Sequence, residues 1–219
     1  MKWAFVFALV FLLGAVVLGA DDKMRTFKFS KDDAGKVPSG WKADQTGKGD
    51  NSSIWKVVPD DTAPSKSGFV LAQTAESPGS MFNLCVFEDA NLKDVEVSVA
   101  FKAVKGNKDQ GGGIVWRYQD ADNYYIARMN PLEDNFRVYK VQGGKRSTQF
   151  QNAEVKVPAG EWHVLKVKMV GDHIECFLDG KKHLDVKDDS ISKAGKVGLW
   201  TKADAQTYFD NFAVLSGKE

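Results

Sequence analysis

Apolar and polar residues alternate with a period of two along much of the chain. In residues 95–101, VEVSVAF, the apolar side chains fall on every second position. The same alternation recurs in residues 165–169, LKVKM, and residues 174–178, IECFL. Because successive side chains of a strand point to opposite faces, this pattern predicts strands that each bury one face.

Turn-forming residues separate these runs, at positions 105–107, 142–144, 170–172 and 179–181. Each of these groups contains glycine, and most also contain asparagine, aspartate or lysine. After the first twenty residues no long helical pattern occurs, and residues 188–192 offer only a weak signal for a short helix or turn. Short strands between such turns predict an all-β fold, a sandwich of two antiparallel sheets.

The beginning of the chain has the layout of a secretory signal peptide. Residues 1–3 are a short basic start, residues 4–18 are almost entirely apolar, and small residues precede Asp21. The apolar run is shorter than the roughly 20 residues of a membrane-spanning helix. An uncleaved N-terminal anchor is the alternative. We therefore expect a signal peptide at 1–20, a secreted or periplasmic protein without a membrane span after cleavage, and a single domain at 21–219.

Composition excludes some partners and leaves the state of the cysteines open. Thirty Lys and Arg residues nearly balance 29 Asp and Glu residues, and no basic block indicates nucleic acid. The two cysteines, Cys85 and Cys176, are able to form a disulfide in an exported protein. Cys176 alternates with Ile174 and Leu178 and so points inward, whereas the side to which Cys85 points is ambiguous. We favour two separate buried thiols over a bridge.

Residues 109–136, DQGGGIVWRYQDADNYYIARMNPLEDNF, combine strand patterning with Trp, Tyr and Arg side chains. They predict two antiparallel strands joined by a polar turn. Flat rings stack on sugar rings, and guanidinium groups bond to hydroxyls. We expect four polar side chains to face solvent on the concave sheet: Arg128, Asn130, Glu133 and Asn135. The alternative is that Arg128 pairs with Glu133 or Asp134 on a solvated face, a contact worth roughly 0–1 kcal/mol.

Two segments of the chain carry a family resemblance. Residues 160–167, GEWHVLKV, followed by residues 174–181, IECFLDGK, resemble a hairpin of laminin-G-like domains in the concanavalin A-like lectin/glucanase superfamily. Residues 195–200, GKVGLW, and 209–212, FDNF, are similar to the end of those domains. The order of elements also resembles the 3-keto-disaccharide hydrolase-like domain of secreted bacterial proteins. From about Phe69 onward, this resemblance implies a concanavalin A-like jelly roll of about a dozen strands.

These observations predict a carbohydrate-binding, lectin-like module that uses its concave sheet. Trp200 and Lys202 are two residues apart in a predicted strand near the end of the chain, so their side chains point to the same face. We include both among the candidate ligand-binding residues. The complete set of expected ligand-binding residues is Trp116, Tyr125, Arg128, Asn130, Glu133, Asn135, Trp200 and Lys202. Two alternatives stay open: a hydrolase or lyase acting on a 3-keto-glycoside, and a structural module whose aromatics serve packing.

Catalytic residues are not identifiable from the sequence. The Glu-x-Asp-x-(x)-Glu run of jelly-roll glucanases is absent, and so is a Gly-x-Ser-x-Gly elbow. Glu133 and Asp134 form the nearest acidic pair. The glycines at 111–113 are better explained by a bulge at a strand entrance than by a ligand contact.

Metal chemistry has little support in the sequence. His163, His173 and His183 do not follow the spacing of a zinc motif. An Asx-rich turn explains the oxygen-bearing side chains of residues 120–123 better than a calcium loop does. We expect no cofactor, with one alternative, a structural calcium ion at Asp210, which the resemblance implies.

Overall fold

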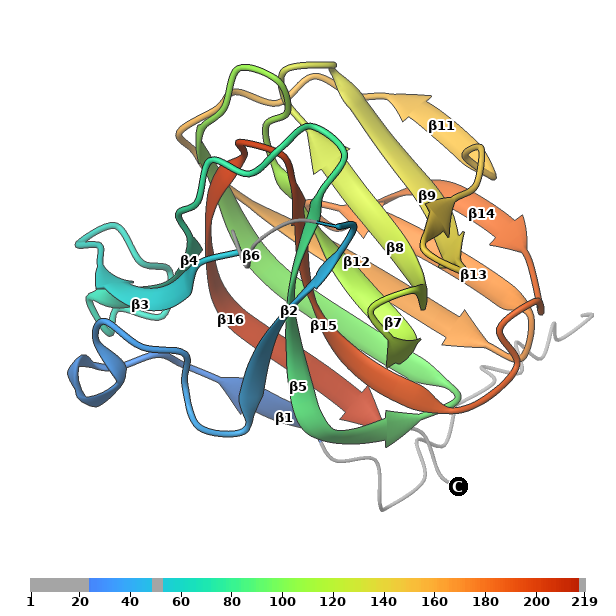
Figure 1. Cartoon of the computed structure of the whole chain (residues 1–219), viewed down its shortest axis with the longest axis horizontal. Helices are drawn as coiled ribbons and strands as arrows, with labels where there is room; N and C mark the ends of the chain where they lie inside the picture. Colours follow the sequence, from blue (N-terminus) through green and yellow to red (C-terminus); the bar gives the residue numbers. More distant parts are fainter. Residues whose placement is uncertain (1–23, 49–52, 217–219) are drawn as a thin grey trace, which may run out of the picture.

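The computed structural model describes residues 24–48 and 53–216, which form two antiparallel sheets stacked as a sandwich (Figure 1). The predicted signal peptide at 1–20 lies outside these residues. One sheet, here called sheet A, has the order β14 (Lys181–Lys187), β13 (His173–Leu178), β12 (Trp162–Val170), β6 (Val95–Lys105), β16 (Gln206–Ser216), β4 (Phe69–Gln73) and β3 (Trp55–Pro59), with β1 (Met24–Phe27) paired to β16.

The second sheet, sheet B, carries the segment that the sequence singled out. Its order is β10 (Lys145–Arg146), β9 (Asn135–Gln142), β8 (Asn123–Asn130), β7 (Gly112–Asp120), β15 (Gly195–Lys202), β5 (Phe82–Leu92) and β2 (Trp41–Thr46), with β11 (Gln151–Glu154) paired to β9. A short 3-10 turn, η1 (Lys31–Asp33), is the one helical element in the described part of the chain. The predicted all-β, two-sheet antiparallel jelly roll is confirmed.

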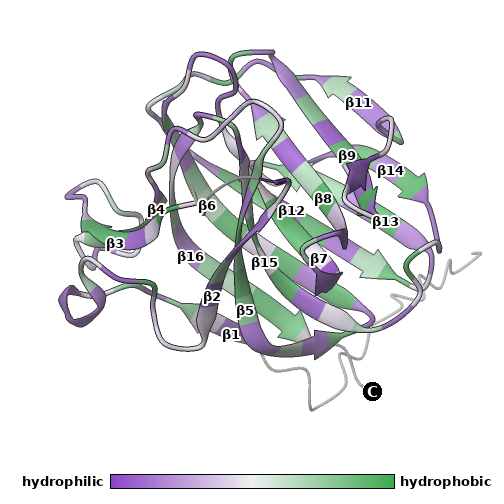
Figure 2. Ribbon diagram, viewed as in Figure 1, coloured by the Kyte–Doolittle hydropathy of each residue, from purple (hydrophilic) through white to green (hydrophobic). Residues whose placement is uncertain are grey.

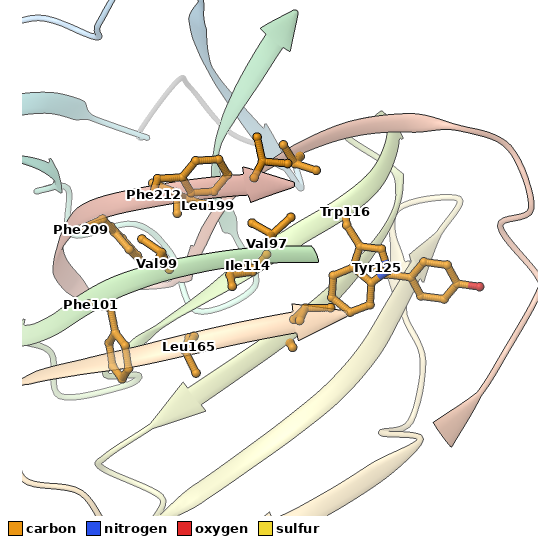
Figure 3. Packing of buried hydrophobic residues seen from close by; sticks show 14 of the residues in the cluster. Val97, Val99, Phe101, Ile114, Trp116, Tyr125, Leu165, Leu199, Phe209 and Phe212 are labelled. Carbon is orange, nitrogen blue, oxygen red and sulfur yellow. The ribbon is translucent and has the colours of Figure 1, made fainter. Parts of the chain in front are cut away.

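The main hydrophobic core fills the space between the two sheets. In sheet A, Val97 and Val99 of β6 lie opposite Val167 and Leu165 of β12, so the alternation seen in the sequence becomes one buried face. Figure 3 shows Val97, Val99 and Leu165 packed near Ile114 and other side chains of sheet B. Along β6 and β12, hydrophobic positions alternate with hydrophilic ones (Figure 2). Burial at roughly 25 cal/mol per Å² makes this face the main source of stability.

Both cysteines lie in this main core as free, fully buried thiols. Cys85 comes from β5 in sheet B and Cys176 from β13 in sheet A. Burial raises the pKa of both thiols. The expectation of two separate buried thiols is confirmed.

Sheet B curls so strongly that strands far apart in its order touch across its outer face. The Thr46 hydroxyl of β2 lies 2.6 Å from the Tyr124 hydroxyl of β8, four strands away in the sheet. In a flat sheet, four strand spacings separate side chains by about 19 Å. The Tyr118 hydroxyl of β7 likewise donates to Asp44 Oδ2 of β2 at 2.8 Å. The outer face of sheet B is therefore the concave face of the molecule.

The middle of this concave face is filled by a second hydrophobic cluster, here called the concave-face cluster. Its residues are Phe82, Leu84, Val86, Val115, Tyr118, Tyr124, Ile126, Val141 and Trp200. The Trp200 and Phe82 rings pack with centroids 5.3 Å apart. Because these side chains are buried, the middle of the concave face offers a ligand little aromatic surface.

A bulge in β7 decides which of its rings reach this cluster. The register of β7 against β15 shifts between Lys196 and Gly198, and Arg117 has a φ of 45°. The extra residue reverses the alternation, so Trp116 points into the main core whereas Tyr118 points to the concave face. Arg117 itself is buried and donates to three main-chain carbonyls, those of Lys93, Gly171 and Ile191.

The glycines at the start of β7 serve close packing of the backbone. A Cβ on Gly113 would lie 2.5 Å from the carbonyl oxygen of Ala127. At Gly111, with a φ of +115°, it would lie 2.2 Å from the carbonyl oxygen of Met129. Both glycines contact the neighbouring strand β8, which agrees with a backbone role for them. The bulge expected at this strand entrance is absent, because β7 pairs with β8 in regular register from Gly112 to Trp116.

Candidate functional site at the end of the concave face

The turn between β8 and β9 folds an acidic side chain back over the end of the concave face. Asn130 closes β8, and its side-chain oxygen accepts the amide of Leu132 at 2.9 Å. The amide of Glu133 donates to the carbonyl of Asn130 at 3.2 Å. Asp134 takes a φ of 49°, a conformation that Asp tolerates better than most residues, and β9 begins at Asn135. This compact turn positions Glu133 above Arg128.

A buried arginine organises the side chains of this turn. Arg128 is 2% exposed and donates from Nη1 to Asn135 Oδ1 and from Nη2 to Glu133 Oε2, both at 2.9 Å. Asn135 Nδ2 in turn donates to Glu133 Oε2 at 3.0 Å. Arg137 of β9 adds a longer ion pair, 3.5 Å from Nη1 to Glu133 Oε2. We call these four residues, Arg128, Glu133, Asn135 and Arg137, the Arg128 network.

The network holds Glu133 in its ionised form. Burial by itself would raise the pKa of Glu133, but hydrogen bonds from Arg128 and Asn135, with the charges of Arg128 and Arg137, outweigh it and lower the pKa to about 2. The side chain of Glu133 remains 38% exposed. It therefore presents a fixed, negatively charged acceptor to solvent at neutral pH.

A second polar group lies beside the network. Asn130 Nδ2 donates to Asp109 Oδ1 at 3.1 Å, and Lys202 Nζ lies 3.3 Å from Asp109 Oδ2. Burial raises the pKa of Asp109 against the opposing effect of Arg128 and Lys202. Asp204 accepts three main-chain amides of residues 107–109 at 2.9 to 3.0 Å, which fixes the loop that carries Asp109. Asp204 therefore has a structural role, as the acceptor that holds this loop.

The structure brings together five of the eight expected ligand-binding residues. Arg128, Asn130, Glu133 and Asn135 meet at one end of the concave face, and Lys202 reaches them through Asp109. The expectation that all of them face solvent is wrong for Arg128, Asn130 and Asn135, which are buried. They are enclosed because they bond to one another. Glu133 and Lys202, whose side chain is 23% exposed, remain accessible.

Trp116 and Tyr125 do not belong to this site. Both are fully buried in the main core, where their rings stack with centroids 5.5 Å apart (Figure 3). The Trp116 Nε1 donor points to Met169 Sδ at 3.1 Å. Tyr125 is three residues before Arg128 on the same strand, so its ring points to the opposite face. The expectation that both rings line the concave face is therefore corrected.

Trp200 lies on the concave face but is 1% exposed within the concave-face cluster. The surface role expected for it is wrong, because the curl of sheet B covers its ring. Curvature of this kind arises from twist and from bulges, which the alternation of a single strand does not reveal. Arg137 was missed for a related reason, since only the pairing of β8 with β9 places it opposite Arg128.

Asp210, the expected calcium ligand, lies in β16 with a fully buried side chain. Its Oδ2 accepts the amide of Ser65 at 2.7 Å, and its Oδ1 has no hydrogen-bond partner among the described residues. A buried carboxylate with one open oxygen is a donor that suits a hard cation. Calcium at this position stays a prediction.

Two of the three histidines, His163 and His173, lie on strands of sheet A and have carboxylate partners. His163 Nδ1 lies 2.8 Å from Asp179 Oδ2 within the hairpin of β12 and β13. His173 approaches Asp185 at 2.7 Å, and with Glu175 these residues offer ligand atoms within 4.8 Å of one another. Pairing of β13 with β14 creates this group, which local spacing in the sequence did not reveal. Lys182 already bonds to both carboxylates, at 2.9 and 2.7 Å.

The hairpin turn at the start of β8 is stabilised by its own side chains. Asp120 Oδ1 accepts the amide of Asp122 and the Nδ2 of Asn123, both at 2.8 Å. These bonds match the Asx-rich turn that the sequence interpretation favoured over a calcium loop.

Among the described residues no helix is long and apolar enough to cross a membrane.

The fold and these motifs define a concanavalin A-like jelly roll. The chain belongs to the 3-keto-alpha-glucoside-1,2-lyase-like domain family, whose model matches residues 29–215. No curated protein matches the sequence.

Solved structures share the fold at low sequence identity. The carbohydrate-binding module CBM66 from Bacillus subtilis has 20% identity and a TM-score of 0.64, covering 81% of this chain and 96% of that chain. A protein of unknown function with a galectin-like fold from Bacillus subtilis has 11% identity and a TM-score of 0.58, covering 88% of this chain and 98% of that chain. A putative glycosyl hydrolase from Parabacteroides distasonis has 16% identity and a TM-score of 0.51, covering 82% and 89%.

Proposed function

We propose that the protein binds carbohydrate at the end of the concave face, through the accessible groups of the Arg128 network and Lys202. The observation that carries this proposal is the arrangement around Arg128, a buried cation that fixes Glu133 and Asn135. Side chains that are already ordered lose little conformational entropy when a ligand binds. This matters for a ligand that is only partly buried, because its contacts supply little free energy to offset such a loss.

The chemistry of these groups suits sugar hydroxyls. The Glu133 carboxylate accepts hydrogen bonds, whereas the Arg137 guanidinium and the Lys202 ammonium donate them. A sugar hydroxyl both donates and accepts hydrogen bonds, so it can pair with either kind of group. The rings of the concave-face cluster are covered, so affinity for a single sugar comes mainly from polar contacts and is expected to be weak. The likeness in fold to a carbohydrate-binding module supports the proposal.

A lyase acting on a 3-keto-glycoside is the second candidate function. The family description favours it, and so does the contrast between Asp109, whose pKa is raised, and Glu133, whose pKa is lowered. Such a contrast is common between the acid and the base of an active site. However, a carboxylate with a pKa of about 2 is a weak base at neutral pH, and proton removal from carbon needs a stronger one. We therefore favour binding over elimination.

We further propose that the protein acts outside the cytoplasm, as a secreted or periplasmic module. The support is the basic, apolar and small-residue pattern of residues 1–20. Identification of the mature N-terminus from the native organism tests this proposal. A mature chain that still begins at Met1 would contradict signal-peptide cleavage.

Affinity electrophoresis against a panel of polysaccharides tests the binding proposal. The wild-type protein should be retarded by at least one polymer, and Arg137→Ala should abolish the retardation. Lys166→Ala is the matched control, because this cation lies in β12 of sheet A, where it pairs with Glu96. Absence of retardation by every polymer, or equal loss in both variants, would reject binding at this site. Turnover of a 3-keto-glycoside that stops in Glu133→Gln would favour the lyase instead.

A further inference from the structure

Three arginines converge on Tyr139 of β9 at the end of the concave face. The Arg146 Cζ lies 4.5 Å from the centre of the Tyr139 ring, and the Arg128 Cζ lies 6.0 Å from it. Arg137 Nη1 lies 3.5 Å from the Tyr139 hydroxyl. These distances place the three guanidinium groups around one side chain.

A single carboxylate, that of Glu133, forms ion pairs with these arginines among the described residues. Glu133 pairs with Arg128 at 2.9 Å and with Arg137 at 3.5 Å. Arg146 has no ion pair within the described residues, and its Nη1 is buried without a hydrogen-bond partner there. Lys202 and Asp109, the nearby pair, balance each other. Three guanidinium groups surround Tyr139, and among the described residues only Glu133 forms an ion pair with any of them, so positive charge is in local excess around this ring.

Aromatic rings hold the unpaired arginine in place. The Arg146 Cζ lies over the Tyr139 ring of β9 and, at 5.5 Å, over the Phe82 ring of β5. Only the curl of sheet B brings these two strands to the same guanidinium. Stacking between rings fixes the plane of the guanidinium and removes water from its faces, which strengthens a charged hydrogen bond made at its edge.

We infer that the site selects an acidic sugar, one that bears a uronate carboxylate or a sulfate ester. This inference rests on the proposed carbohydrate binding and names its ligand class. The anion would pair with the guanidinium of Arg146, whose side chain is partly exposed, and would neutralise part of the surplus charge. A guanidinium fork matches the two oxygens of a carboxylate or sulfate in a way that an ammonium does not.

General attraction between the protein and polyanions does not explain such selectivity. The whole chain carries a net charge of +1, so the surplus at Tyr139 is local. Lys145, the neighbour of Arg146 in β10, is exposed and has no ion pair in the described parts of the chain. It offers a matched cation at almost the same position, but without the rings.

Matched pairs of polymers test the inference by affinity electrophoresis and calorimetry at low and at moderate salt. Polygalacturonate is compared with the same polymer after reduction of its carboxyl groups, and dextran sulfate with dextran. We expect the wild-type protein to bind the acidic member of at least one pair ten-fold or more tightly. The pair that shows the preference distinguishes the carboxylate from the sulfate.

Substitutions then locate the preference. Arg146→Gln should remove most of it, and Lys145→Gln should leave it within two-fold, with thermal unfolding confirming that both variants fold. Arg146→Lys restores the charge without the fork and should recover only part of the preference. Equal binding of neutral and acidic polymers would overturn the inference while leaving carbohydrate binding intact. Equal loss in the Lys145 and Arg146 variants would also overturn it, and failure to bind any polymer would overturn the proposed function itself.

Discussion

The contact between Glu133 and Arg128 predicts a stability difference that depends on pH. The change is Glu133→Gln, which keeps an oxygen acceptor but removes the charge that faces a buried guanidinium. In the folded protein the pKa of Glu133 is about 2, against 4.5 for an ordinary glutamate. A difference of this size corresponds to about 3 kcal/mol before solvent screening is taken into account.

Exposure reduces this figure. The Glu133 side chain is 38% exposed, so water screens much of its attraction to Arg128. The amide of the variant also retains a neutral hydrogen bond, worth about 1 kcal/mol. We therefore expect Glu133→Gln to lower the free energy of unfolding by about 1–2 kcal/mol at pH 7. In a domain of this size, that loss lowers the melting temperature by about 2–8 °C.

The sign of the pH dependence follows from the direction of the shift. Because the folded state has the lower pKa, the unfolded state takes up the proton first as pH falls below about 4.5. The stabilisation by the charged form is complete above that pH and is lost as pH falls toward 2. The difference between the wild-type protein and Glu133→Gln should shrink by more than half between pH 6 and pH 3.

Urea unfolding of both proteins at several pH values measures this difference. Glu161→Gln is the matched control, since Glu161 is exposed and forms no ion pair among the described residues. Its effect should stay within about 0.5 kcal/mol at every pH. A difference for Glu133→Gln that does not change with pH, or that grows on acidification, would refute the assignment of a charged Glu133 paired with Arg128.

Three further predictions concern the core, the thiols and the buried carboxylate. Trp116→Ala should cost about 3–5 kcal/mol in urea unfolding, because its ring is fully buried, and retention of wild-type stability would contradict the core placement. Thiol titration should give no rapid reaction in the native protein and two free thiols after unfolding, since Cys85 and Cys176 are buried and unpaired; one disulfide would contradict this result. If Asp210 binds calcium, chelation should lower the melting temperature of the wild-type protein but not that of Asp210→Asn, and an unchanged wild-type value would exclude the ion.

The strands were predictable because their signal is local. The sequence predicts that Val95, Val97 and Val99 point to one buried face, and the structure shows all three buried. The prediction succeeds because a strand with one buried face has a period of two. The hairpin at residues 162–178 also follows its predicted course. Fold class therefore follows from local patterning together with the family resemblance.

The concave face was not predictable in the same way, because it depends on long-range geometry. A single bulge at Arg117 separates Trp116 from Tyr118, although both share one parity in the sequence. The curl that covers Trp200 arises from contacts such as Thr46 with Tyr124, 78 residues apart. Arg146 meets Tyr139 and Phe82 for the same reason. The alternation of apolar and polar residues shows to which side of its own strand a side chain points. It does not show which residues from other strands of the sheet cover that side chain.

The polar residues of the β8–β9 turn were recognised from sequence because they do not suit a packed sheet, and their burial strengthens that argument. Placing the Arg128 guanidinium away from water has a large desolvation penalty, which a carboxylate partner offsets only in part. An apolar side chain at this position would fill the same space without that penalty. Arg128 instead orders Glu133 and Asn135 at one end of the concave face, beyond the hydrophobic cluster. Stability alone does not account for this arrangement, whereas the proposed presentation of fixed polar groups to a carbohydrate does.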